Sequence, residues 1–87
     1  MGHKTPDMFF VYILYSKSLD RYYVGHTASL NDRIKRHNSG RSKATKGGIP
    51  WSLIYKEMFE NKADAYKRER SIKAKKSRIY IEKLIAG

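Results

Sequence analysis

The sequence predicts an α+β domain in which a three-stranded antiparallel sheet is flanked by helices, in the order β-β-α-β-α-α. Two segments rich in aromatic and β-branched residues, 8–15 and 22–27, are joined by a polar connection of hairpin length. A third such segment, 51–59, follows a long basic stretch that is rich in glycine. Three further segments carry apolar residues at helical spacing, which completes the expected order.

The length of 87 residues is that of one domain. Residues 1–7 contain a proline and show no periodicity, so we expect a flexible N-terminus followed by a single domain over 8–87. The absence of cysteine excludes disulfides and thiolate zinc sites. The longest apolar run, 8–15, is too short to cross a bilayer, and we expect a cytoplasmic protein.

The charge indicates the class of partner. Nineteen Lys and Arg against eight Asp and Glu give a net charge of +11, a field that attracts polyanions such as nucleic acid. A membrane surface fits less well, because the basic segments lack a broad apolar opposite face. The charge suits nucleases and nucleic-acid binders alike, so it does not identify an activity.

The first two strands are expected to form a hairpin. Residues 8–15 are apolar on both alternating sets, which predicts a central strand covered on both faces. Residues 22–27 return antiparallel to it, and Gly25 allows close approach of backbone or ligand. If the connecting loop is symmetric about residues 17 and 18, Tyr12 lies opposite Tyr23 and both hydroxyls emerge on one face.

A helix is predicted from Ser29 to Gly40. Ser29 can cap its start, with Asp32 three residues on, and Gly40 can take the left-handed position past its end. At the angular spacing of a helix, Arg33 and His37 fall at the border of the apolar stripe. A side chain at such a border can be held rigidly and still reach a ligand.

Residues 38–50 are expected to form a loop with at most a short helical turn, followed by a strand over 51–59. Alternation in that strand separates two sets of side chains: Trp51, Leu53 and Tyr55 on one face, Ile54 and Met58 on the other. Asn61 is expected to cap a helix that runs to about Lys73, and a last helix begins at about Ser77.

The helix after Asn61 carries a carboxylate within its apolar stripe. Ala65, Glu69 and Ile72 share one face at spacings of four and three. An unpaired buried carboxylate is costly, so Glu69 needs a cation. A neighbouring Lys or Arg could supply a salt bridge. A divalent ion held by Glu69, waters and a substrate phosphate is the alternative.

Two motifs, Val11-Tyr12-Ile13 and Tyr23-Val24-Gly25, resemble the paired motif of the GIY-YIG nuclease superfamily. Further matching residues follow in the order of that family: His26-Thr27, Leu30, Arg33, His37-Asn38, Gly40, Thr45-Lys46, Pro50-Trp51, Tyr55, Phe59, Arg68-Glu69 and Ile72-Lys73. The chain is similar in particular to the small stand-alone members, over about residues 8 to 85.

The resemblance implies cleavage of DNA phosphodiesters with Mg²⁺ or Mn²⁺ by a three-stranded sheet flanked by helices. The site positions of the family fall on Tyr12, Tyr23, Arg33, His37 and Glu69, and Glu69 would bind the metal. The first motif reads Val-Tyr-Ile instead of Gly-Ile-Tyr, so its tyrosine aligns after a shift of one. His26 stands where some relatives carry lysine, and its role is left open.

These residue types suit the hydrolysis of a phosphodiester. Arg33 can hold the phosphate through a two-pronged contact, and Glu69 with a divalent ion would stabilise the leaving oxygen. Tyr12, Tyr23 and His37 are candidates for positioning and activating water. Without the resemblance, the tyrosines read as sheet aromatics, His37 as a satisfied helix histidine and Arg33 as a surface residue.

Seven cations are expected to contact the DNA backbone: Arg36, Arg41, Lys43, Lys46, Lys73, Lys75 and Lys76. DNA is favoured over RNA as the partner, the endonuclease is expected to serve repair or recombination, and the protein is expected to be a monomer or a weak dimer. A non-catalytic or partner-dependent nucleic-acid-binding module on the same scaffold is the alternative. An RNA-binding accessory protein would share the charge without requiring the five site residues.

Overall fold

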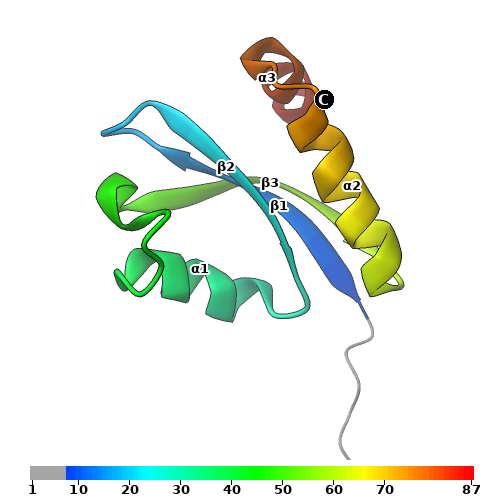
Figure 1. The fold of residues 1–87 in the computed structure, drawn as a ribbon, viewed down its shortest axis with the longest axis horizontal. Coiled ribbons are helices and arrows are strands. Elements are labelled where there is room, and N and C mark those ends of the chain that lie inside the picture. Colours follow the sequence, from blue (N-terminus) through cyan, green and yellow to red (C-terminus); the bar gives the residue numbers. More distant parts are fainter. Residues whose placement is uncertain (1–7) are drawn as a thin grey trace, which may run out of the picture.

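The computed structural model describes residues 8–87 and has the predicted architecture (Figure 1). Strands β1 (Phe9–Ser16), β2 (Arg21–Thr27) and β3 (Trp51–Phe59) form one antiparallel sheet in the order β2-β1-β3. The helices are α1 (Leu30–Asn38), α2 (Lys62–Ala74) and α3 (Arg78–Ala86), and a short 3₁₀ turn, η1 (Lys46–Gly48), precedes β3. The predicted fold class, element order and central first strand are confirmed. The predicted flexible N-terminus, residues 1–7, lies outside the described residues.

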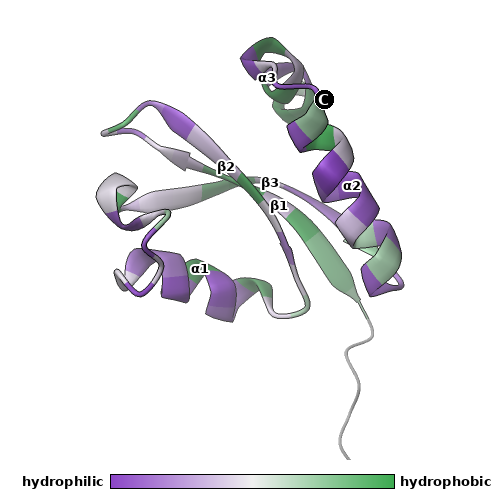
Figure 2. Ribbon diagram, in the orientation of Figure 1, coloured by the Kyte–Doolittle hydropathy of each residue, from purple (hydrophilic) through white to green (hydrophobic). Residues whose placement is uncertain are grey.

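Helices cover both faces of the sheet, α1 on one face and α2 with α3 on the other (Figure 1). The side chains of β1 alternate between the faces, so this strand contributes to both cores. The core under α2 and α3 is aliphatic: Val11, Ile13, Val24, Ala65 and Ile72. The core under α1 is built on Tyr12, Leu14 and Trp51. Figure 2 shows hydrophobic residues along β1 and hydrophilic residues over much of α1 and α2. Within residues 8–87, no helix combines the length and the apolar character needed to cross a membrane.

The β1–β2 register differs from the predicted one by two residues. Tyr12 lies opposite Gly25, and Tyr23 lies opposite Leu14, so the prediction that the two tyrosines face each other is wrong. The strands remain paired down to Ser16 and Arg21, so the centre of the turn lies one residue further along the chain than predicted. The Ser16 hydroxyl accepts a hydrogen bond from the Leu19 N–H in this turn, at 3.2 Å. A shift of two preserves the faces, and both tyrosines therefore still point to the α1 face.

A β-bulge divides β3 into two halves with opposite alternation. Ile13 pairs with Tyr55, but the next residue of β1 pairs with Leu53, so Ile54 is inserted between them. Trp51 consequently packs on the α1 face, whereas Tyr55 packs on the α2 and α3 face. The prediction that Trp51 and Tyr55 share a face, opposite Ile54, is wrong for this reason.

The predicted cap at Asn61 is present, and Ser77, near which the last helix is expected to begin, caps α3 in the same way. The side chains of Asn61 and Ser77 each accept a hydrogen bond from the backbone N–H three residues on, at 2.8 and 3.1 Å. The expected cap by Ser29 is wrong, because its side chain makes no capping bond and its N–H instead donates to the Thr27 hydroxyl at 3.0 Å. Gly40 has φ 81°, the left-handed conformation predicted for it.

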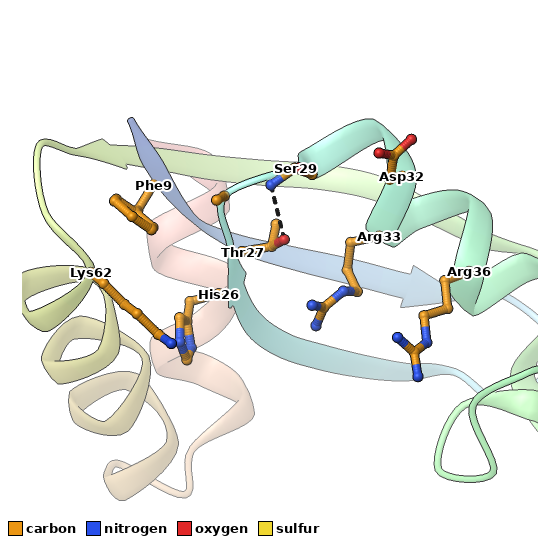
Figure 3. A pocket seen from close by; sticks show the side chains of 9 residues that line it. Phe9, His26, Thr27, Ser29, Asp32, Arg33, Arg36 and Lys62 are labelled. Carbon is orange, nitrogen blue, oxygen red and sulfur yellow. Dashed lines mark hydrogen bonds between the residues drawn. The ribbon is translucent and has the colours of Figure 1, made fainter. Parts of the chain in front are cut away.

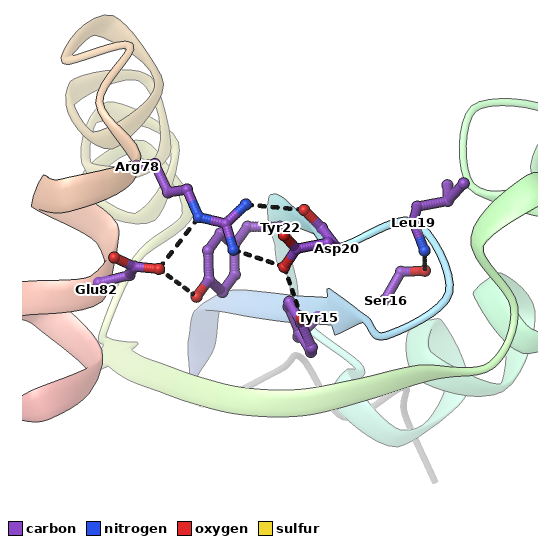
Figure 4. Close-up of polar contacts among 7 residues, drawn as sticks. All are labelled: Tyr15, Ser16, Leu19, Asp20, Tyr22, Arg78 and Glu82. Atoms are coloured by element: carbon purple, nitrogen blue, oxygen red, sulfur yellow. Dashed lines mark hydrogen bonds and ion pairs between the residues drawn. The ribbon is translucent and has the colours of Figure 1, made fainter.

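Helix α3 is tied to the β1–β2 hairpin by surface contacts (Figure 4). Arg78 donates to the Asp20 carboxylate at 2.6 Å and to the Asp20 carbonyl at 2.8 Å. Its guanidinium lies 5.0 Å from the centroid of the Tyr22 ring, and the Tyr22 hydroxyl donates to Glu82 at 3.1 Å. Each exposed contact stabilises the fold only slightly, and α3 also packs Tyr80, Ile81 and Leu84 against the aliphatic core.

Candidate active site

Two tyrosines and a histidine meet on the α1 face of the sheet. The Tyr12 hydroxyl lies 3.0 Å from Nε2 of His37, in a buried hydrogen bond between β1 and α1. The Tyr23 ring lies edge-on to the His37 ring, with centroids 4.9 Å apart, and 6.4 Å from the Tyr12 ring. Tyr12 is fully buried, whereas Tyr23 is partly exposed. The structure thus brings three of the five predicted site residues into one cluster.

Gly25 makes room for this cluster. A Cβ at position 25 would lie 2.5 Å from the Tyr12 hydroxyl oxygen and 2.7 Å from the ring carbon that bears it. Any larger residue would therefore displace the Tyr12 ring. The close approach predicted for Gly25 is real, and the group that approaches is a side chain of the neighbouring strand.

His37 lies deeper than the sequence indicated. It is 3% exposed and is the only buried residue of α1, so its predicted place at the border of the apolar stripe is wrong. The burial is possible because both ring nitrogens have partners, Nε2 with Tyr12 and Nδ1 with the Thr45 hydroxyl at 2.9 Å. Arg33, one turn earlier on α1, is half-buried as expected.

The environment keeps Tyr12 and His37 in their neutral forms. Burial raises the pKa of Tyr12 to about 12, Tyr23 adds to this rise, and the nearby Arg33 opposes it. Burial also lowers the pKa of His37, and the charges of Arg33 and Arg36 lower it further. A neutral phenol and a neutral imidazole therefore lie beside a fixed positive charge at neutral pH.

Glu69 approaches from the other side of the sheet. Its carboxylate contacts Nδ1 of His26 on β2 and accepts a hydrogen bond from Nζ of Lys73 at 2.5 Å. Burial acts to raise the pKa of Glu69, but the hydrogen bonds from Lys73 and His26 outweigh it and lower the pKa below its usual range. The carboxylate is thus ionised and paired, and Lys73 is one of the salt-bridge partners considered from the sequence.

Glu69 and the two tyrosines lie on opposite sides of the edge strand β2, but only a short distance apart. Nζ of Lys73 lies 5.8 Å from the centroid of the Tyr23 ring, and the charge of Glu69 contributes to the raised pKa of Tyr12. No further strand of the described chain lies beyond β2, so side chains from both faces meet around this edge. The site therefore extends across β2 at Tyr23 and Gly25.

A cleft of about 580 Å³ opens beside this site, between α1, the end of β2 and the start of α2 (Figure 3). Arg33 and Arg36 enter it from α1, and Lys62 and His26 line the opposite side. Asp32 also lines the cleft, but its carboxylate points away from the two guanidinium groups in Figure 3. The cleft is consequently positive and suited to a phosphodiester chain.

The family model of the GIY-YIG catalytic domain matches residues 8–83. The chain belongs to the GIY-YIG family. A UPF0213 protein of Clostridium perfringens is 48% identical over 67 residues, which cover 76% of this chain and 71% of that protein. A UPF0213 protein of Staphylococcus aureus is 43% identical over 68 residues, covering 77% and 82%. The solution NMR structure of a UPF0213 protein from Bacillus halodurans superimposes with a TM-score of 0.58 at 35% identity, covering 91% of this chain and 83% of that one.

Membership of this nuclease family agrees with the resemblance stated from the sequence, including the likeness to small single-domain members. The matched range contains all five positions predicted from the motifs.

The adjacent residues Arg68 and Glu69 make different contacts in the structure. Arg68 makes a two-pronged salt bridge to Glu57 on β3, at 2.9 and 3.0 Å, and ties α2 to the sheet, whereas Glu69 points to the β2 edge.

The donor set of this GIY-YIG site fits a hard divalent ion held mainly by substrate and water. Among residues 8–87, no three His, Asp or Glu side chains cluster as a metal site. Glu69 supplies one carboxylate beside the imidazole of His26. Mg²⁺ commonly binds through one or two carboxylates together with waters and phosphates, so Glu69 fits such an ion once Lys73 moves aside.

The seven predicted DNA contacts separate into groups. Arg36 lines the positive cleft, and Arg36 and Arg41 line a neighbouring depression. Lys43 and Lys46 are exposed in the loop before β3, while Lys73, Lys75 and Lys76 lie exposed at the end of α2. Sequence reasoning missed Lys62, one cation among nineteen without a distinguishing pattern, and Thr45, which it placed in a motif without assigning a role.

Proposed function

We propose that this protein is a divalent-metal-dependent endonuclease that hydrolyses DNA phosphodiesters. The proposal is supported most strongly by the meeting of a neutral Tyr12–His37 pair, Arg33 and an ionised Glu69 around β2, at positions of a GIY-YIG domain. Phosphodiester hydrolysis needs a positioned water, a charge partner for the phosphate oxygens and stabilisation of the leaving oxygen.

Arg33 holds the scissile phosphate in this proposal. Its guanidinium lines the positive cleft, and its charge acts to lower the pKa of the Tyr12 hydroxyl. A planar guanidinium can donate two parallel hydrogen bonds to phosphate oxygens, which fixes the phosphate in orientation as well as in place. Arg36 and Lys62, in the same cleft, are placed to hold neighbouring phosphates of the strand.

Tyr12, Tyr23 and His37 position the attacking water beside that phosphate. Tyr12 is held by its hydrogen bond to His37 and by its packing over Gly25, so its hydroxyl has a defined direction. Tyr23 forms the partly exposed wall of the cluster. The pKa of Tyr12 is about 12 even with the positive charge of Arg33 nearby, so at neutral pH Tyr12 would position the water as a neutral phenol.

Glu69 is the proposed ligand for Mg²⁺ or Mn²⁺. When bound there, the ion would neutralise charge on the leaving oxygen. His26 contacts the same carboxylate and fixes its direction. Lys73 neutralises Glu69 in the free protein and yields the carboxylate on loading; its side chain is about half exposed, so it can move into solvent.

The direct test is cleavage by the pure protein of branched, nicked and linear DNA, with and without Mg²⁺ or Mn²⁺. We expect metal-dependent cuts in the wild type and cleavage slower by roughly 10²- to 10³-fold with Arg33→Ala. Preference for branched or nicked DNA would support a role in repair or recombination. Tight binding of all three DNAs without cleavage in either metal would contradict the proposal and favour the non-catalytic nucleic-acid-binding module.

The metal role of Glu69 is tested by Glu69→Gln. We expect cleavage and Mn²⁺ binding by calorimetry to be lost, while the free energy of unfolding changes by less than about 1 kcal/mol, because the partner Lys73 reaches solvent. A buried structural salt bridge would instead cost roughly 3–5 kcal/mol when one partner is removed. A large fall in melting temperature with activity retained in the folded fraction would contradict the metal role.

A further inference from the structure

Thr45 is a buried residue with a hydroxyl directed at the candidate site. It is 1% exposed, and its Oγ1 lies 2.9 Å from Nδ1 of His37. The sequence between α1 and β3 is otherwise polar, basic and glycine-rich, so a fully buried residue there requires an explanation. The hydrogen bond to His37 provides one, because it continues the pair formed by His37 and Tyr12.

The position of Thr45 is held by several contacts that do not involve its hydroxyl. The indole N–H of Trp51 donates to the Thr45 carbonyl at 2.6 Å, and the Thr45 N–H donates to the Ser42 carbonyl at 3.2 Å. Asn38, next to His37, bonds both the N–H and the carbonyl of Trp51, at 2.6 and 3.0 Å. The end of α1 and the start of β3 thus hold Thr45 against His37.

Gly48 belongs to the same support. A Cβ at position 48 would collide with the Trp51 ring and would lie 2.9 Å from the Ser16 hydroxyl. The indole can therefore reach the Thr45 carbonyl only over a glycine. A loop constrained in this way presents the Thr45 hydroxyl to His37 in a fixed direction.

The hydrogen-bond partners decide where the protons lie. Among residues 8–87, the Thr45 hydroxyl has His37 Nδ1 as its only hydrogen-bond partner. Neutral His37 has one N–H and one bare nitrogen, so one of its two buried hydroxyl partners donates to the ring and the other accepts. The positive charge of Arg33 acts on the Tyr12 hydroxyl and favours its oxygen as an acceptor, so we assign the donor role to Thr45. Nδ1 then accepts, the ring proton lies on Nε2, and Nε2–H donates to the Tyr12 oxygen.

We propose that Thr45 is a positioning residue that holds His37 in the Nε2–H form, so that His37 donates to the Tyr12 oxygen and does not take up the Tyr12 O–H as a donor. The inference rests on the proposed function for its catalytic consequence. In this arrangement Nδ1 of His37 accepts a hydrogen bond and Nε2–H donates one, so both ring nitrogens are paired. His37 therefore supports Tyr12 as a hydrogen-bond donor and does not itself take the proton of the attacking water.

The opposite arrangement has a distinct consequence. If Thr45 accepted from Nδ1–H, the Tyr12 hydroxyl would donate to Nε2 and its proton would be held by His37. Tyr12 could then offer the substrate only a lone pair. The two arrangements differ in one observable, the nitrogen of His37 that carries the proton.

The test combines nitrogen NMR of the His37 ring with cleavage kinetics on Thr45→Val, which removes the hydroxyl, and Thr45→Ser, which keeps it. We expect the Nε2–H form in the wild type and in Thr45→Ser, and a mixture of forms in Thr45→Val. In Thr45→Val, kcat should fall roughly 10- to 100-fold, as for other residues that orient a site histidine, with KM unchanged. Ser42→Ala, in the same turn, is the control and should alter neither observable.

An Nδ1–H form in the wild-type protein would overturn the inference, whatever the variants do. So would a Thr45→Val protein with unchanged ring protonation and unchanged kcat. The wild-type spectrum needs neither DNA nor a folded variant, so the tautomer is tested even if Thr45→Val does not fold. A wild-type protein with the Nε2–H form but without nuclease activity would contradict the proposed function and leave the role of Thr45 toward His37 intact.

Discussion

The two faces of the sheet bury their side chains in different ways. Under α2 and α3, the fully buried residues are aliphatic and pack without hydrogen bonds between side chains: Val11, Ile13, Ala65 and Ile72. Under α1, the buried groups include a phenol, an imidazole, a hydroxyl and an indole, and each of these polar groups has a partner: Tyr12, His37, Thr45 and Trp51. Alternate residues of the same strand, β1, contribute to both.

The difference indicates that the two faces serve different purposes. Apolar burial stabilises the fold by roughly 25 cal/mol per Å² without requiring particular directions between groups. Buried polar groups gain little net stability, because each hydrogen bond mostly replaces one with water, but they fix directions. We infer that the α2 and α3 face holds the domain together, and that the α1 face holds Tyr12 and His37 in place for the reaction.

The largest expected effect is on the aliphatic face. Ile72→Ala should lower the free energy of unfolding by about 2–5 kcal/mol, because Ile72 is 1% exposed and its loss removes buried apolar surface and leaves a cavity. Urea unfolding measures the loss. Cleavage per folded molecule should fall much less than in Arg33→Ala, since Ile72 contributes no polar group to the site.

Ile79 offers a matched control on the neighbouring helix. It is 67% exposed, so Ile79→Ala should change the free energy of unfolding by less than about 0.5 kcal/mol. If Ile72→Ala were to abolish cleavage in its folded fraction, the packing of Ile72 would be needed to position Glu69 on α2, and the contrast between the two faces would fail.

On the polar face, Arg33→Ala should act on the reaction and not on the fold. We expect cleavage to fall roughly 10²- to 10³-fold, comparable to loss of one donor to a developing charge, with little change in DNA affinity or in melting temperature. Lys35→Ala, an exposed cation on the same helix, is the control. A parallel collapse of DNA affinity would make Arg33 a general anchor instead of the residue that holds the scissile phosphate.

Much of the fold follows from local patterns in the sequence. The bounds of β3, the cap at Asn61 and the start of α3 near Ser77 depend on residues within a few positions of one another, and the sequence predicts them correctly. The β1–β2 register and the alternation within β3 do not follow from local patterns. The register depends on where the hairpin turn closes, and the alternation on the bulge at Ile54, which is a property of strand pairing.

The same limit applies to the candidate site. Helical spacing placed His37 at a border, because an imidazole reads as polar until its partners are known. Those partners, Tyr12 and Thr45, are 25 and 8 positions away in the chain. The contact of His26 with Glu69 spans 43 positions. Motif spacing identified the residues, but only tertiary structure pairs them.

A smaller effect is expected on the basic surface at the end of α2. Replacing Lys73, Lys75 and Lys76 together by Gln should weaken binding to any DNA sequence and flatten the dependence of log K on log salt by up to about three units. Lys67→Gln, exposed on the same helix, should leave the slope unchanged. An unchanged slope in the triple variant would place the DNA on the cleft of Arg36 and Lys62 instead.

The smallest expected effect is a pH dependence that belongs to the polar face. His37 is surrounded by Tyr12, Tyr23 and the charges of Arg33 and Arg36, and burial lowers its pKa below 6.5. The unfolded chain therefore binds a proton more readily than the folded one in this range. The contribution of His37 to stability is fully present above about pH 6.5 and is lost as the pH falls toward its folded pKa.

We expect the urea midpoint of the wild type to fall between pH 7 and pH 5, and His37→Gln, which cannot titrate, to show a smaller fall over the same range. Lys35→Gln leaves His37 in place and should follow the wild type. Because the aliphatic face contains no titratable group among its buried residues, the difference between wild type and His37→Gln isolates the polar face. Identical pH dependence in the two proteins would mean that protonated His37 is accommodated within the fold, and the α1 face would then be less rigid than its hydrogen bonds indicate.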